Sequence, residues 1–269
     1  MRRGFVGGAP TLHMVVADLH VHTRNSDGSL SLETLPDAAD AAGVSTVAVT
    51  DHDRLHPDLP TPVATVDGVT VVHGIELRVA TADGRIDLLG YGARRTAELT
   101  SLTERLQADR LERGAAIIDR VEDRLGIDLP IEPHEGIGRP HIAEAISTAS
   151  GYSYAAAFEE LIGEDCPCYL PRDVPTFEAG VAALREACSL VGLAHPYRYD
   201  DPESALAHCS ALGAVERFYP YGRDVDPRAV DRAIERYDLL ATGGSDAHDD
   251  RLGEAGLDAD AYRAFRAAL

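Results

Sequence analysis

The stretch 15–28, VVADLHVHTRNSDG, begins as a β-branched run and ends in side chains of the types that bind metals. Alternate residues of a strand point to the same side, so His20 and His22 can bind one ion. Asp27 precedes Gly28 and fits either a turn or a further ligand, and we favour the ligand. This stretch therefore predicts a strand that ends in a metal site.

Further acid-and-histidine motifs follow along the chain, several of them directly after apolar runs. They are VAVTDHD at 47–53, VVHGIEL at 71–77 with an expected turn at 74–76, RPH at 139–141, LAHP at 193–196 and GGSDAH at 243–248. Helical patterns at 30–43 and 176–188 separate the apolar runs, which predicts a parallel α/β architecture. The carboxyl ends of parallel barrel strands share one rim, where enzyme sites lie, so we expect the motifs to converge there.

The middle of the chain interrupts the β/α alternation. Apolar residues recur at helical spacing through 96–125, and shorter helical patterns follow. We therefore expect a small helical insertion at 97–170, an α/β domain made of 14–96 and 171–269, and a loose N-terminal tail at 1–13.

The composition limits the partners and the compartment. The net charge is −20, and all 25 basic residues are arginine. Such acidity is typical of proteins from salt-loving organisms, although a GC-rich genome also favours arginine over lysine, and it repels double-stranded DNA. We expect no membrane span and no signal peptide, because the longest apolar runs are short. Four cysteines without a CxxC motif favour a reducing, cytoplasmic location without disulfides.

The candidate ligands combine imidazoles and carboxylates, which suits Mn²⁺, Zn²⁺ or Fe²⁺ rather than Ca²⁺. They outnumber the positions around one ion, so we expect two to three divalent ions, which together activate water and hold phosphoryl oxygens. The candidates are His20, His22, Asp27, His52, Glu76, His141, His195, Asp246 and His248.

The motifs within 18–28, 50–53, 74–76, 194–196 and 244–248 resemble those of the PHP (polymerase and histidinol phosphatase) family. The resemblance covers residues 15–250 and implies a distorted (β/α)7 TIM-like barrel with a trinuclear centre. It implies a first metal held by His20, His22, Glu76 and Asp246, a second held by Asp27, His52 and His248, and a third held by Glu76, His141 and His195.

Within the family, the length and the insertion are similar to the bacterial nucleotide phosphoesterases. That similarity implies hydrolysis of nucleoside monophosphates, nucleoside 3′,5′-bisphosphates or the 5′ ends of short RNA by a metal-bridging hydroxide, with no further catalytic side chain. Arg198 and Arg139 lie close to metal motifs in the sequence and are candidate phosphate contacts, since guanidinium binds phosphate bidentately. That branch tends to carry a lysine near Cys166, and this chain has none, which leaves the exact substrate open.

Two other functions fit some of these motifs. An amidohydrolase-type hydrolase also uses an HxH motif, but its binuclear form needs a carboxylated lysine, and its mononuclear form leaves Asp27, Glu76 and His141 without a role. A non-catalytic PHP domain usually has eroded ligands, whereas every motif is intact here. Metal content and phosphate release distinguish the three functions.

Overall fold

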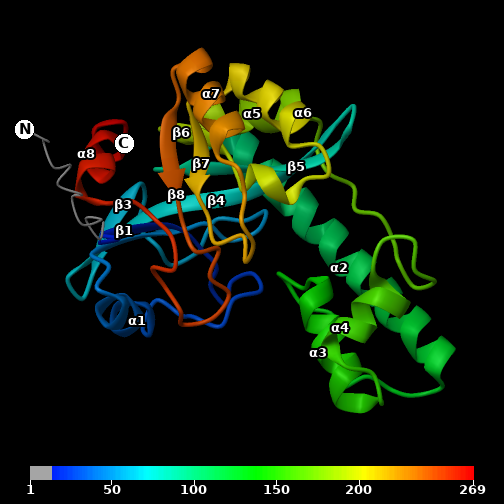
Figure 1. The fold of residues 1–269 in the computed structure, drawn as a ribbon. Coiled ribbons are helices and arrows are strands. Elements are labelled where there is room, and N and C mark those ends of the chain that lie inside the picture. The colour runs from blue at the N-terminus through cyan, green and yellow to red at the C-terminus, as the bar shows by residue number, and fades with distance from the viewer. Residues whose placement is uncertain (1–13) are drawn as a thin grey trace, which may run out of the picture.

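The structure is a computed structural model that describes residues 14–269, so the expected tail at 1–13 lies outside the described residues. A curled eight-stranded sheet forms its centre (Figure 1). The strands are β1 Ala17–Val21, β2 Thr46–Val49, β3 Val63–Val66, β4 Val69–Thr81, β5 Gly84–Tyr91, β6 Leu190–Leu193, β7 Ala214–Phe218 and β8 Leu240–Gly243. Their order is β1-β2-β4-β5-β6-β7-β8, with β3 paired to β4.

Strand direction explains why the motifs meet. The strands β1, β2 and β4 are parallel to one another, and so are β6, β7 and β8. The strand β5 is antiparallel to both of its neighbours, so β4 and β5 form a hairpin without an intervening helix. A parallel bridge joins Val21 to Ala247 and brings the two ends of the curled sheet together. The fold is therefore α/β, and the β/α alternation is interrupted from β2 to β5, where four strands follow one another without a helix.

Helices cover the outside of the sheet, with α5, α6 and α7 over the half that contains β5 to β8 (Figure 1). The helix α5 lies so close to β4 that a Cβ on Gly180 would come within 2.4 Å of a Val79 methyl, which explains the glycine there. These helices are α1 Leu35–Ala42, α5 Phe177–Ala187, α6 Pro202–Ala207, α7 Arg228–Tyr237 and α8 Ala259–Ala267, with short 3₁₀ turns η2 at Pro196–Arg198 and η3 at His208–Ala211.

A helical lobe extends from one side of the sheet (Figure 1). It consists of α2 Ala97–Leu125, α3 Arg139–Ala149, α4 Tyr154–Ala157 and the π-helix η1 Phe158–Ile162. The first half of α2 buries Leu99 and Leu106 in a core shared with β4, β5 and α5. Its second half buries Ile117 and Val121 in a separate core with α3 and η1. One helix thus belongs to both cores.

The structure differs from two of the sequence predictions, both in the first third of the chain. The expected turn at 74–76 is instead part of the long strand β4. The helix expected at 30–43 begins only at Leu35, where Pro36 occupies the first helical turn.

All four cysteines are free thiols. Within residues 14–269, none of the helices is both long and apolar enough to cross a bilayer.

Candidate metal centre

Buried acids and histidines gather where the strands end. His20 is in β1 and His22 follows it, while His52, His195 and Asp246 follow β2, β6 and β8. Glu76 reaches the same place from within β4, because β4 continues beyond the end of β2. The Glu76 amide donates a hydrogen bond to Thr50 O at 3.2 Å. Three groups of potential ligands result, and each has ligand atoms within 4.8 Å of one another. They are His20, His22, Glu76 and Asp246; His22, Asp27, His52 and His248; and Glu76, Asp87 and His195.

The first group matches the set that the resemblance implies for the first metal. His22 Nε2 lies 3.0 Å from Asp246 Oδ1 and 3.4 Å from Glu76 Oε2, and His20 Nε2 lies 3.5 Å from the same Glu76 oxygen. His20 Nε2 is buried without a hydrogen-bond partner among residues 14–269, and Glu76 Oε2 lies 2.7 Å from His52 Nδ1. Unpaired buried polar atoms are costly in a folded protein, so this group fits a cation that binds them.

The second group contains the three expected residues and also His22. His52 Nε2 lies 3.7 Å and His248 Nε2 3.4 Å from Asp27 Oδ1, which is buried without a hydrogen-bond partner in the described chain. Burial alone would lower the pKa of His52, but the carboxylates of Asp27 and Glu76 raise it to about 9. The strong negative field that holds a proton on this imidazole is also suited to a divalent ion.

The third group differs from the expected one, because the structure places Asp87 there and leaves His141 out of all three groups. His141 is in the first turn of α3, and its Nδ1 accepts a hydrogen bond from the Gly138 amide at 3.0 Å. The His141 ring therefore caps the N-terminus of α3. Asp87 lies on β5, and its Oδ2 is 3.8 Å from His195 Nε2. A single acid within the apolar run IDLLGY was the sequence signal for it.

Buried acids behind the ligands hold them in position. Glu216 Oε1 lies 3.0 Å from His20 Nδ1, and its Oε2 accepts the amide N–H of His195 at 2.7 Å. Asp51 accepts hydrogen bonds from Thr23 and Ser26 and so fixes the loop that carries Asp27. Partners of this kind fix ring orientation and tautomer in metal sites.

Arginines surround the cavity above these groups, which has a volume of about 290 Å³. It adjoins a larger cavity of about 710 Å³, and both are lined by the two expected phosphate contacts, Arg198 and Arg139. Arg198 Nη1 donates to Asp246 Oδ2 at 2.9 Å and to the Tyr219 hydroxyl at 3.0 Å. Arg139 has no carboxylate within 4.0 Å in the described chain, and its guanidinium lies over the rings of Phe158 and Tyr169. These positive charges suit a phosphorylated ligand.

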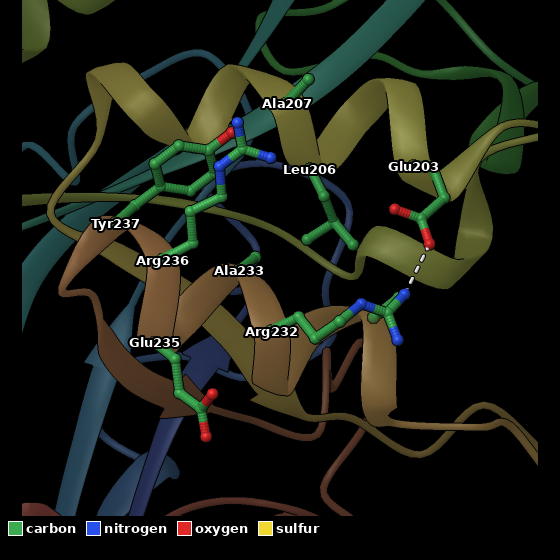
Figure 2. A pocket seen from close by; sticks show the side chains of 9 residues that line it. Glu203, Leu206, Ala207, Arg232, Ala233, Glu235, Arg236 and Tyr237 are labelled. Atoms are coloured by element: carbon green, nitrogen blue, oxygen red, sulfur yellow. Dashed lines mark hydrogen bonds and ion pairs between the residues drawn. The ribbon is translucent and has the colours of Figure 1, made fainter.

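A separate groove of about 440 Å³ lies between α6 and α7 (Figure 2). Arg232 crosses it to bind Glu203 at 2.9 Å, and both side chains are exposed. It shares no lining residue with the arginine-lined cavity, so it is not part of the candidate metal centre.

The PHP domain model matches residues 18–156, which include much of this site. The chain belongs to the PHP domain family. It is 30% identical to a phosphoribosyl 1,2-cyclic phosphate 1,2-diphosphodiesterase of Eggerthella lenta, over 87% of this chain and 94% of the relative. It is 26% identical to a 3′,5′-nucleoside bisphosphate phosphatase of Chromobacterium violaceum, over 91% of this chain and 90% of the relative.

The fold is also known from a solved structure. A protein of Bifidobacterium adolescentis assigned to the metal-dependent phosphoesterases superposes with a TM-score of 0.75 at 25% identity, covering 94% of this chain and 96% of its own. The family, these relatives and the clustered ligands identify the PHP protein as a metal-dependent phosphoesterase, that is, a hydrolase of phosphoric esters.

Proposed function

We propose that this PHP protein hydrolyses phosphomonoesters of nucleotides at a multinuclear metal centre. One observation carries the proposal: neighbouring ligand groups, linked by the shared residues His22 and Glu76, border an arginine-lined cavity. Divalent ions bound there would supply Lewis acidity and an activated water for attack at phosphorus. A mononuclear amidohydrolase would use only one of these groups, so the clustering favours the phosphoesterase.

We assign ligands to two ions from the geometry. His20, His22, Glu76 and Asp246 would hold the first, and Asp27, His52 and His248 would hold the second, with His22 near both. Mn²⁺, Zn²⁺ and Fe²⁺ all accept such mixed nitrogen and oxygen ligands. Glu76 presents Oε2 to His20 and His22 and Oε1 to His195, 2.9 Å away, so this carboxylate lies between neighbouring groups.

The chain's own residues would bind and orient the phosphate. Arg198 is tied to Asp246 through one nitrogen, so it can contact a phosphate oxygen while remaining beside a metal ligand. Arg139 faces the same cavity from the start of α3, and burial lowers its pKa because it disfavours the charged guanidinium. Cations placed around a transferring phosphoryl group stabilise the charge that develops on its oxygens.

We further propose that residues 14–96 and 171–269 form a distorted (β/α)7 barrel and that 97–170 form an insertion which frames the substrate. The separate core of the helical lobe supports this division. The larger cavity adjoining the centre leaves room for the nucleoside part of a substrate or for a short RNA end.

A substrate panel tests the function. Metal-depleted protein would be reloaded with Mn²⁺ and supplied with nucleoside monophosphates, 3′,5′-bisphosphates, 5′-phosphorylated short RNA and phosphoribosyl 1,2-cyclic phosphate, and phosphate release or ring opening would be measured. We expect turnover of at least one nucleotide phosphomonoester by the wild type. The variant His22→Asn should lose this turnover, and the exposed control His134→Asn should keep it. Turnover of the cyclic phosphate alone would replace the nucleotide proposal, and no turnover of any compound would refute it.

A further inference from the structure

The third ligand group differs from the other two, because an arginine of the chain already binds both oxygens of one of its carboxylates, Asp87. Arg78 donates from Nε and Nη2 to the two oxygens of Asp87, at 2.7 and 2.6 Å. The Asp87 side chain is only 2% exposed. Two parallel charge-assisted hydrogen bonds of this kind are among the strongest in proteins.

The pair is fixed by the β4–β5 hairpin. Arg78 and Asp87 are direct partners in the antiparallel register, so their side chains lie on the same face of the sheet. Glu76 is two residues before Arg78 in the same strand and therefore points to that face too. The guanidinium thus lies beside the carboxylate that the first and third groups share.

The hydrogen bonding shows which groups still need a cation. In the first two groups, His20 Nε2 and Asp27 Oδ1 have no hydrogen-bond partner in the described chain, and Arg198 binds only one oxygen of Asp246. In the third group, both Asp87 oxygens bind Arg78, and His195 Nε2 lies 2.9 Å from Glu76 Oε1. The Asp87 oxygens that a third ion would need are thus already paired with Arg78, and an ion there would also be repelled by the guanidinium.

We propose that Arg78 takes the place of a third metal ion: the centre binds two divalent ions, and the guanidinium supplies the third positive charge. This inference rests on the proposed function and changes the trinuclear expectation. The two bonds to Asp87 leave Nη1 without a hydrogen bond to the described chain, and Arg78 lines both cavities. The Nη1 group is therefore available to bind a phosphate oxygen.

Metal counting tests the proposal. Wild-type protein, Arg78→Met and the control Arg232→Met would be equilibrated with buffered Mn²⁺, and bound metal would be measured by dialysis and elemental analysis. We expect about two ions per chain in the wild type and the control, and about three in Arg78→Met, where Asp87 is free to bind a metal. The control removes an arginine from the exposed pair with Glu203 in the groove shown in Figure 2.

Activity gives a second measurement. With the third ion absent, Arg78→Met should lose about 10²–10³-fold in kcat, and saturating Mn²⁺ should restore part of it as the third ion binds. About three ions in the wild type would overturn the proposal, and so would an unchanged count in Arg78→Met. If that variant does not fold, the wild-type count alone still decides. If no phosphoester is turned over while these counts are found, the proposed function fails and the metal assignment stands.

Discussion

Asp53 links three segments that are distant in the sequence, and its removal should destabilise the protein strongly. Its Oδ2 accepts hydrogen bonds from Arg110 of α2 at 2.6 Å and from Arg172 at 2.5 Å, and its Oδ1 accepts the Arg78 amide at 3.1 Å. The Asp53 side chain is fully buried, and those of Arg110 and Arg172 are 6% and 12% exposed. Asp53→Asn would leave two nearly buried guanidinium charges without a counter-charge.

The magnitude follows from this burial. Removing one partner of a buried ion pair costs about 3–5 kcal/mol, chiefly because the remaining charge stays desolvated. With about 2–4 °C per kcal/mol in a chain of this size, the melting temperature should fall by about 6–20 °C. The burial of Asp53 would raise its pKa, but the two arginines hold that pKa well below its usual range, which is consistent with a strong pair.

The assay is urea unfolding followed by circular dichroism, on protein stripped of metal so that the neighbouring His52 does not confound the result. The matched control is Asp231→Asn, which removes the carboxylate of a more exposed pair with Arg217. Exposed pairs contribute about 0–1 kcal/mol, so the control should be nearly neutral. A cost for Asp53→Asn no larger than that of the control would refute the reasoning.

Three further predictions concern Glu216, His141 and Cys209. Glu216→Gln should weaken Mn²⁺ binding by about 10–100-fold, because it removes the carboxylate that orients the His20 ring. Isothermal titration calorimetry measures this affinity, and an unchanged affinity would contradict the positioning role of Glu216. His141→Asn should keep the wild-type metal count by elemental analysis, because the ring caps α3; the loss of one ion would restore it as a ligand. Burial raises the pKa of Cys209 to about 12. Between the unfolded value of about 8.5 and this value, only the folded state keeps the proton, so the free energy of unfolding should fall by about 1.4 kcal/mol per pH unit. Cys209→Ala should reduce this slope in urea titrations, and equal slopes would refute it.

The sequence was most informative where a ligand follows a short parallel strand. Four histidines lie within or directly after apolar runs that the sequence identifies as strands: His20, His22, His52 and His195. The structure brings all four together. The position of Asp87 depends on the antiparallel hairpin, which breaks the β/α alternation and cannot be inferred from the period of a short apolar run. His141 has the right residue type beside a proline, but its orientation depends on how α3 begins.

Pairing between distant residues was also beyond the sequence. Asp53 and Arg172 are 119 positions apart, and nothing local to either predicts their contact. The Arg78–Asp87 pair becomes visible only when the register of β4 and β5 is known. The residue types around the centre could thus be predicted, but their partners required the tertiary structure.

The continuity of α2 has a consequence for ligand binding. The helix is 29 residues long, about 43 Å, and it enters both cores, so a continuous helix joins the helical lobe to the sheet at this connection. The conformational entropy of ordering Arg139 and its aromatic neighbours over the cavity is therefore lost when the chain folds and not when a ligand arrives. Such preorganisation reduces the cost of association and leaves more of the arginine–phosphate attraction as net affinity.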